Sequence, residues 1–340
     1  MVATQTTVGW LDGVVISTQT RMIHFDPHKK KSSMGHNIFI SHAHNDHVRG
    51  LSLLGKGYLT AETKEILEKR KQRDFFKNCI SVRFGNKVVI DKLEITVHNS
   101  GHVLGSAQYE ISDSISTIVY TGDINCREML TTKAAEVIPC DTLILETTYG
   151  NPSYSFPNTT EIYVKIINWT INEMQKGNIP TFIVYSVGKA QEIVKIFNEF
   201  TNLPIVTSHS VAMVNEVYNR YGVKLNYFDA ISEEGKELLK QPRIQVISPS
   251  EKRSASGRCS FAYATGWAVK YGLNSTDVVF PLSSHADFNQ LVNYVRQAKP
   301  KEIFTVHGFK EDFARYVSKK FGIRAREIQP IKDSLHNFLW

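Results

Sequence analysis

The sequence predicts an α/β protein in which one α/β unit is inserted into another. Residues 1–150 read mostly as short strands, whereas residues 160–321 alternate strands with helices, which is typical of a parallel α/β layer. The alternating part separates two stretches that carry histidines, so we expect an inserted unit rather than an appended one. We place this insert at 154–272, with 1–153 and 273–340 as the two parts of the outer unit.

Alternating β-branched residues, interrupted by turn signals such as Gly85-Asn86 and Asp91-Lys92, indicate strands in the first part of the chain. One helix is predicted there, at 61–71, and strands are predicted at 13–18, 22–25, 37–41, 79–84, 87–90, 93–98, 108–111, 117–121 and 143–147. In the rest of the chain, helices are predicted at 160–176, 189–200, 211–221, 289–297 and 310–321, and strands at 181–185, 204–207, 245–248, 261–266, 277–282 and 302–306.

The composition excludes several classes of protein. Hydrophobic residues make up 42% and charged residues 21%, which favours a soluble globular chain over a disordered one. Apolar runs such as 180–185 are too short to span a bilayer, so we expect no membrane partner. The four cysteines are scattered and the N-terminus does not resemble a secretory signal, so we expect a cytoplasmic location. The net charge of +7 weakly favours a polyanionic partner.

The strongest chemical signal is the run His42-Ala43-His44-Asn45-Asp46-His47, which follows the strand predicted at 37–41. Imidazole and carboxylate ligands suit zinc or a similar divalent ion, and the alternating spacing lets successive side chains address two adjacent ions. A solvated polar loop is the alternative interpretation.

Four more residues, each at a predicted strand end beside glycine, serine or aspartate, extend this signal, namely His102, Asp123, His285 and His307. Each alone is an ordinary loop residue. Together with the first run they are too many for one ion and match two, and a two-metal site with bridging solvent indicates hydrolytic chemistry.

These residues resemble the metallo-β-lactamase superfamily, and Glu146, His285 and His307 in their segments resemble its β-CASP nuclease branch. The segments 188–191, 265–267 and 282–287 are similar to short archaeal and bacterial mRNA 3′-end-processing-factor-like proteins and ligase-associated DNA exonucleases. The resemblance covers nearly the whole chain. It implies a metallo-β-lactamase αββα sandwich with an inserted α/β β-CASP domain.

The resemblance also implies a pair of zinc ions, with manganese as an alternative. The ligands of the first ion would be His42, His44 and His102. Those of the second would be Asp46, His47 and His307, and Asp123 would bridge the two. Asp26 matches an early aspartate of the family, which supports the histidine loop from behind the ligands.

By the same resemblance, the reaction would be hydrolysis of a nucleic-acid phosphodiester, leaving a 5′-phosphate and a 3′-hydroxyl. Besides Asp46, the expected catalytic residues are His285 and Glu146. His285 would be the general acid that protonates the leaving alkoxide, and Glu146 would orient the His285 ring. Only the order of the motifs separates the role of His285 from that of His307.

A strand-to-helix turn in the insert is the predicted phosphate contact, through Ser186, Gly188 and Lys189, because free backbone N–H groups at a helix start bind phosphate. An ordinary helix start is the alternative, and Ser283 and Ser284 are lesser candidates. We therefore expect a nuclease, most simply an exonuclease, acting on RNA or single-stranded DNA in RNA processing or decay, or in DNA repair. A non-catalytic nucleic-acid-binding subunit and a small-molecule metallo-hydrolase on the same fold remain the alternatives.

Overall fold

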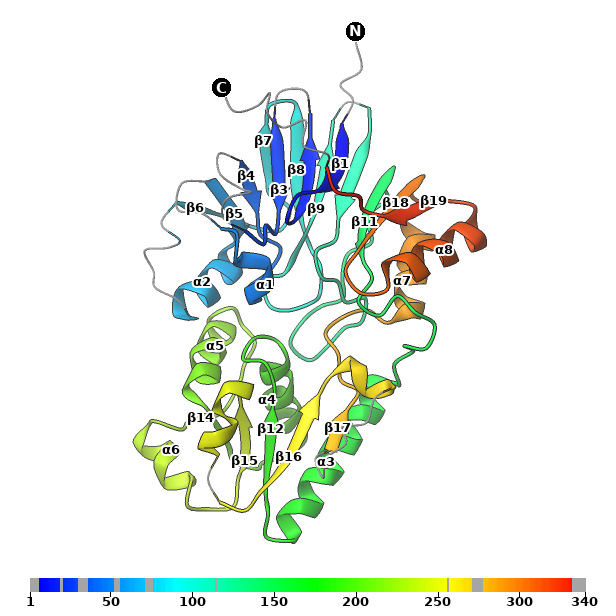
Figure 1. Cartoon of the computed structure of the whole chain (residues 1–340). Coiled ribbons are helices and arrows are strands. Elements are labelled where there is room, and N and C mark those ends of the chain that lie inside the picture. The colour runs from blue at the N-terminus through cyan, green and yellow to red at the C-terminus, as the bar shows by residue number, and fades with distance from the viewer. Residues whose placement is uncertain are drawn as a thin grey trace.

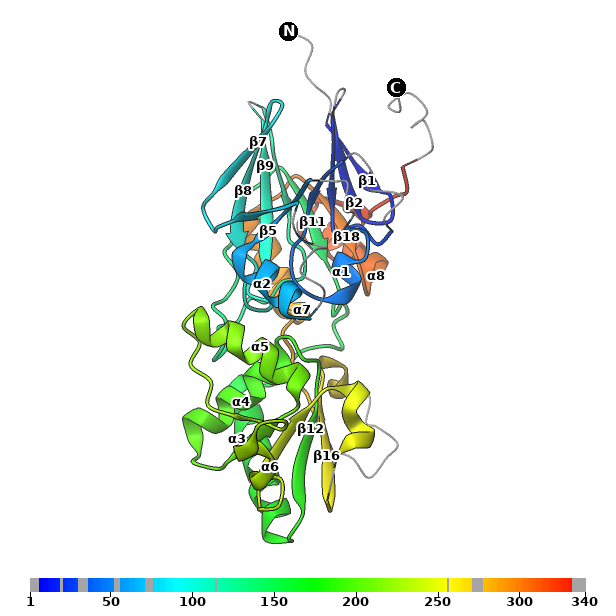
Figure 2. The same cartoon turned by 90° about the vertical axis from the view of Figure 1, so that its left-hand side faces the viewer.

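The computed structural model describes residues 6–18, 21–29, 36–51, 56–70, 76, 78–113, 115–255, 257–270 and 278–331. Figure 1 shows two sheets packed face to face above a third sheet that has its own helices. The view in Figure 2, turned by 90°, shows the same division, with the green and yellow segment below the rest.

Sheet A forms one layer of the sandwich, with strand order β1-β2-β3-β4-β5-β6. Its strands are β1 (Thr7–Trp10), β2 (Val14–Ser17), β3 (Met22–Phe25), β4 (Asn37–Phe39), β5 (Lys56–Thr60) and β6 (Cys79–Val82). The pairs from β3 to β6 are parallel, and the connections between these strands include α1 (Asn45–Val48) and α2 (Ala61–Arg70).

Sheet B forms the second layer, with strand order β19-β18-β11-β10-β9-β8-β7. Its strands are β7 (Lys87–Ile90), β8 (Leu93–Asn99), β9 (Ala107–Ser112), β10 (Thr117–Tyr120), β11 (Thr142–Glu146), β18 (Glu302–Val306) and β19 (Arg324–Glu327). Strands β10, β11, β18 and β19 run parallel, so their carboxyl ends meet at one edge of the sheet.

The hydrophobic core between the two layers accounts for the sandwich. Phe25 and Phe39 of sheet A are buried against Tyr109 and Tyr120 of sheet B. The outer face of sheet B is covered by α7 (Phe288–Ala298) and α8 (Lys310–Phe321), whose apolar side chains form a second cluster with that sheet. The predicted α/β class, an αββα sandwich with further α/β structure inserted in the chain, is confirmed.

The insert contains sheet C, a fully parallel sheet of order β14-β13-β15-β12-β16-β17. Its strands are β12 (Ile179–Ile183), β13 (Ile205–Thr207), β14 (Phe228–Asp229), β15 (Ile244–Ile247), β16 (Cys259–Ala264) and β17 (Val278–Phe280). Its helices are α3 (Thr159–Gln175), α4 (Lys189–Phe200), α5 (His209–Arg220), α6 (Glu233–Leu238), η3 (Pro249–Ser254) and η4 (Gly266–Val269).

The end of the insert differs from the sequence prediction. The predicted boundary between 272 and 273 lies outside the described residues. Strand β17, which follows it, pairs with β16 and therefore belongs to sheet C. Within the described part of the chain, no helix is long and apolar enough to cross a membrane.

Apolar packing joins the insert to the sandwich. A single cluster of buried side chains runs from Ile38 and Leu59 of sheet A, through Val103, to Phe182 and Ile193 of the insert. Because protein interiors pack densely, a shared cluster of this kind holds the two units in one relative position.

Glu192 on α4 adds a polar tie between the units. Its carboxylate is buried and accepts hydrogen bonds from the backbone N–H groups of Leu130 and Thr131, at 3.0 and 3.1 Å, and from the Thr131 hydroxyl at 2.6 Å. The Tyr163 hydroxyl of α3 donates to the same carboxylate. Glu192 therefore satisfies the donors of a loop in the sandwich from a helix in the insert.

We expect Glu192→Gln to lower the free energy of unfolding by about 2–3 kcal/mol, because a buried charged acceptor is lost and an amide N–H then faces donors. The measurement is urea unfolding followed by circular dichroism. Glu199→Gln is the matched control, since Glu199 lies on the same helix and makes only a partly exposed pair with Lys195, worth less than about 0.5 kcal/mol. Equal effects of the two substitutions would contradict this role of Glu192.

Candidate metal centre and adjoining cleft

The polar side chains singled out in the sequence meet at the edge of the sandwich that faces the insert. Asp123 follows β10, Glu146 ends β11 and His307 follows β18, and these are neighbouring parallel strands of sheet B. His42 follows β4 of the facing sheet, and His102 lies in the turn after β8. Strand order therefore brings together residues that are far apart in the chain.

A first group of possible metal ligands consists of three histidines and one aspartate. His42 Nε2 lies 2.9 Å from His44 Nδ1, and His102 Nε2 lies 3.2 Å from the same His44 nitrogen. Asp123 Oδ2 lies 3.5 Å from His42 Nε2 and 3.7 Å from His102 Nε2. One donor atom from each of the four residues lies within 4.8 Å of the others.

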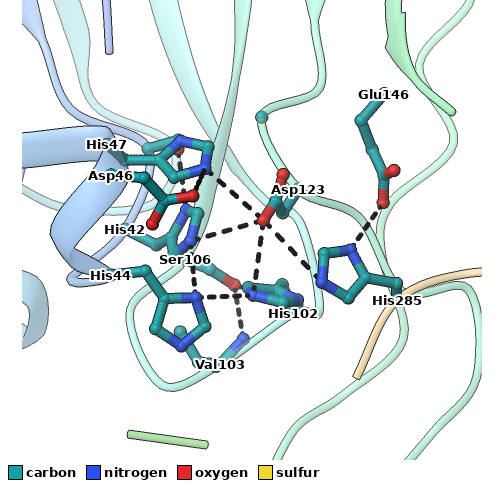
Figure 3. A network of polar contacts seen from close by, with 12 residues as sticks. His42, His44, Asp46, His47, His102, Val103, Ser106, Asp123, Glu146 and His285 are labelled. Atoms are coloured by element: carbon teal, nitrogen blue, oxygen red, sulfur yellow. Dashed lines mark hydrogen bonds and ion pairs between the residues drawn. The ribbon is translucent and has the colours of Figure 1, made fainter. Parts of the chain in front are cut away.

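Asp123 also belongs to two further groups of the same compactness, one with His47 and His307 and one with Glu146 and His285. Figure 3 shows its carboxylate between the imidazoles of His42, His47, His102 and His285. Its Oδ2 atom lies 3.5 Å from His47 Nε2 and 3.9 Å from His285 Nε2. Among the described residues, Asp123 is therefore the member common to all three groups.

Asp46 lies outside these three compact groups. Its Oδ2 atom is 3.7 Å from His47 Nε2, and 67% of its side chain is exposed. The resemblance implies that Asp46 is a ligand of the second ion, whereas in the structure this carboxylate lies at the rim of the centre.

The second ring nitrogen of each histidine in the first group is held by another residue. His44 Nε2 lies 3.3 Å from the carbonyl of Val187 in the insert, and His102 Nδ1 lies 2.8 Å from the carbonyl of Ser284. His42 Nδ1 lies 2.9 Å from the hydroxyl of Ser41. Such partners fix the orientation of an imidazole that binds a metal through its other nitrogen.

Asp26 holds His47 in the same way, with Oδ2 2.8 Å from His47 Nδ1. Its carboxylate also accepts hydrogen bonds from the Ser41 N–H at 2.7 Å and from the Tyr120 hydroxyl at 2.8 Å. Asp26 has φ +45°, which is unusual for a residue other than glycine, and the hydrogen bonds maintain this conformation. Asp26 thus lies behind the histidine loop, and its role as a support for a metal ligand stays a prediction.

The electrostatics of the cluster suit divalent cations. Burial, reinforced by neighbouring histidines, lowers the pKa of His42 and His102 well below the usual value, so both are neutral imidazoles with a lone pair to donate. Burial also acts to lower the pKa of His47, but the carboxylates of Asp123, Asp26 and Asp46 outweigh it and raise this pKa to about 10. The carboxylates thus draw positive charge to this position, and the donor set fits zinc-type ligation.

His285 lies beside this cluster and is held by Glu146. His285 Nδ1 is 3.0 Å from Glu146 Oε1, and the other carboxylate oxygen accepts the Thr148 N–H at 2.7 Å. Burial acts to lower the pKa of His285, but the carboxylates of Glu146 and Asp123 raise it above its usual value. His285 can therefore hold a proton next to the cluster.

A cleft of about 620 Å³ opens over the cluster and is lined by both units. The residues that line it include three cationic side chains, those of Arg49, Arg70 and Lys189, the carboxylates of Asp46 and Asp123, and Ser186. A cleft of this size and charge can accommodate an anionic ligand larger than a single phosphate group.

The predicted phosphate contacts are only partly in this cleft. The Gly188 N–H donates to the Gln191 side chain at 2.7 Å, so the prediction of a free backbone donor at Gly188 is wrong. Ser283 and Ser284 line a narrow space beside Lys189 rather than the main cleft. The Ser283 hydroxyl accepts the His285 N–H at 3.0 Å, which gives it a local structural role.

The cleft residues that were not assigned a role from the sequence include Arg49, Arg70, Tyr185 and Trp267. Arg49 lies two residues after His47, so its proximity to the histidine run was a usable signal. The Arg70 guanidinium reaches the cleft by donating to the Ala43 carbonyl at 3.0 Å, which follows only from the packing of α2.

Comparisons with known proteins agree with this description. Residues 51–138 match the model of a metallo-β-lactamase superfamily domain. Residues 278–326 match the model of a Zn-dependent metallo-hydrolase RNA specificity domain, which covers β18, α8 and His307.

Several curated proteins are similar over most of the chain. A probable DNA ligase from Opitutus terrae is 27% identical over 83% of this chain, which spans 28% of the ligase. RNase aCSPSF2 from Saccharolobus solfataricus is 24% identical over 84% of this chain and 72% of that protein. An RNase J-like protein from Methanocaldococcus jannaschii is 24% identical, with 84% and 83% covered.

A solved structure supports the fold. The crystal structure of a protein of unknown function from Enterococcus faecalis V583 superposes with a TM-score of 0.65. It covers 91% of this chain at 15% sequence identity.

Proposed function

Because the chain belongs to the β-CASP branch of the metallo-β-lactamase superfamily, we propose that it hydrolyses phosphodiester bonds of RNA or single-stranded DNA. The observation that carries this proposal is the His285–Glu146 pair. His285 lines the cleft, and its Nε2 atom lies 3.9 Å from Asp123 Oδ2. A proton donor, a cluster of metal ligands and a site for a polyanion are the three parts that such a reaction needs.

Two zinc ions are the proposed cofactors, with manganese as an alternative. His42, His44 and His102 would hold one ion, and His47 and His307 would hold the other. Asp123 would contact both, and Asp46 would complete the second site from its rim. When bound, such a pair supplies hydroxide at neutral pH and offsets negative charge on the phosphate.

His285 is the proposed general acid. Attack on phosphorus expels an alkoxide, which leaves slowly unless it is protonated. Glu146 holds the Nδ1 side of the ring, so Nε2 faces Asp123 and the cluster with its proton available to the leaving oxygen. The expected products are a 5′-phosphate and a 3′-hydroxyl.

The cationic cleft supports a nucleic-acid substrate over a small neutral one. Arg49, Arg70 and Lys189 line the same cleft as Asp123, and their charges would attract a phosphate backbone. The relatives include an RNase and a probable DNA ligase, so their names are consistent with RNA and with DNA as the substrate.

The test is digestion of matched single-stranded RNA and DNA, labelled at the 5′ or the 3′ end, by zinc- or manganese-loaded protein. We expect ladders of products from one labelled end, as an exonuclease gives. The labelled end then shows the direction of digestion, and the comparison of RNA with DNA shows the preferred sugar. Internal fragments would indicate an endonuclease. If neither polymer is cut while both metals are bound, the proposal fails in favour of a binding subunit or a small-molecule hydrolase.

A further inference from the structure

Two of the aromatic side chains that line the cleft are exposed. Tyr185 is 66% exposed and Trp267 is 38% exposed, and both line the cleft that contains Asp123 and His285. Exposed aromatic faces in a cationic cleft are the usual means by which proteins bind unpaired bases.

The topology of sheet C puts these two residues at one place. Strands β12 and β16 are parallel neighbours, with Ile183 opposite Tyr263, and Tyr185 and Trp267 follow their carboxyl ends. The chain leaving β12 continues to β13 on one side, whereas the chain leaving β16 continues to β17 on the other. Ligands of open α/β sheets bind where the connections diverge in this way.

Neighbouring groups hold both rings in place. The Lys189 ammonium lies 5.9 Å from the Tyr185 ring centroid, a cation–π contact that orients the ring beside a phosphate-attracting charge. Trp267 packs on Tyr149 with centroids 4.9 Å apart, and Tyr149 packs edge-on against His285 at 5.9 Å. Trp267 is thus one ring removed from the proposed general acid. Trp267 also packs against Tyr154, with ring centroids 5.2 Å apart, and part of its side chain stays exposed.

We propose that Tyr185 and Trp267 stack against bases of a single strand next to the bond that is cut. The inference rests on the proposed function and narrows its substrate class to unpaired nucleic acid, because paired bases do not expose their faces. Arg49, Arg70 and Lys189 would neutralise the phosphates while the two rings hold the bases, a division of roles typical of single-strand binding.

The test measures binding of a fluorescein-labelled single-stranded oligonucleotide by anisotropy. It uses the full, metal-loaded chain and phosphorothioate linkages, which resist cleavage and keep their charge. We expect Tyr185→Ala and Trp267→Ala each to weaken binding by about 5- to 150-fold, the range for loss of one stacked base. Tyr185→Phe and Trp267→Phe should retain most of the affinity. Phe228→Ala is the matched control, because Phe228 is 40% exposed on β14, at the far edge of sheet C.

Two substrates separate stacking from other roles. An oligonucleotide with abasic central residues should bind wild type and both alanine variants equally, and a duplex should bind wild type more weakly than the single strand does.

The loss of affinity caused by Tyr185→Ala should be the same at low and physiological salt, whereas Arg70→Ala should reduce the salt dependence of binding. Unchanged affinity of both alanine variants, or an equal loss on the abasic strand, would overturn the inference.

The outcome is independent of cleavage. If stacking is observed but wild type cuts neither RNA nor DNA when loaded with metal, the proposed reaction fails and the binding inference stands. If wild type cuts both polymers and the alanine variants bind normally, only the stacking inference fails.

Discussion

Replacing Asp123 by alanine is expected to abolish metal binding and to lower phosphodiester cleavage by more than about 10³-fold, since metal ions contribute several kcal/mol to such reactions. Asp123 is the residue shared by all three compact groups of possible ligands. Its loss therefore affects every position at which an ion would bind. The measurements are metal content by mass spectrometry and cleavage of a labelled oligonucleotide.

The control is Asp141→Ala, because Asp141 precedes β11 at the opposite end from Glu146 and pairs with Lys301 at 2.7 Å. It should retain metal and activity. Asp46→Ala is an intermediate case, since the Asp46 carboxylate lies at the rim of the centre. We expect this variant to lose at most one of the two ions. Full metal content and full activity in Asp123→Ala would refute the two-metal proposal.

Replacing His285 by alanine is expected to lower kcat on an oligonucleotide by about 10²- to 10⁴-fold, the usual contribution of a positioned general acid. The metal content should not change. On thymidine 5′-p-nitrophenyl phosphate, whose leaving group departs without a proton, the same variant should remain close to wild type. The comparison of the two substrates isolates proton donation from binding.

Glu146→Gln tests the positioning of that acid. The amide retains the shape of the side chain but removes the charge that raises the pKa of His285. We expect a smaller loss than for His285→Ala. The alkaline limb of activity on the oligonucleotide should shift to lower pH, because His285 then loses its proton at a lower pH. If His285→Ala instead lowers activity equally on both substrates and also loses an ion, His285 is a metal ligand. The compact group of Asp123, Glu146 and His285 also allows that role.

Elements with strong local patterns were predictable from the sequence. The strands Met22–Phe25 and Lys87–Ile90 and the helices Lys189–Phe200 and Lys310–Phe321 have the predicted bounds. Apolar periodicity and adjacent turn residues are local properties, so a single sequence is enough to identify them. The ligand chemistry of the histidine run was evident for the same reason.

Elements stabilised mainly by their neighbours were missed. β5 (Lys56–Thr60) contains a glycine and lies between two parallel partners, and a Cβ at Gly57 would lie 2.8 Å from Leu51 Cδ1. β19 (Arg324–Glu327) is largely charged and is a strand because its backbone pairs with β18. Strand pairing between separate segments leaves little trace in short polar sequences.

The arrangement of the site depends on contacts between segments far apart in the chain. Residue types and motif order were sufficient to identify the candidate ligands and the His285–Glu146 pair. The position of Asp46 at the rim, the occupied N–H of Gly188, and the grouping of Arg70, Tyr185 and Trp267 in one cleft were not predictable. These features are set by strand order and by the packing of the insert against the sandwich, because distances between side chains follow from tertiary contacts and not from local residue preferences.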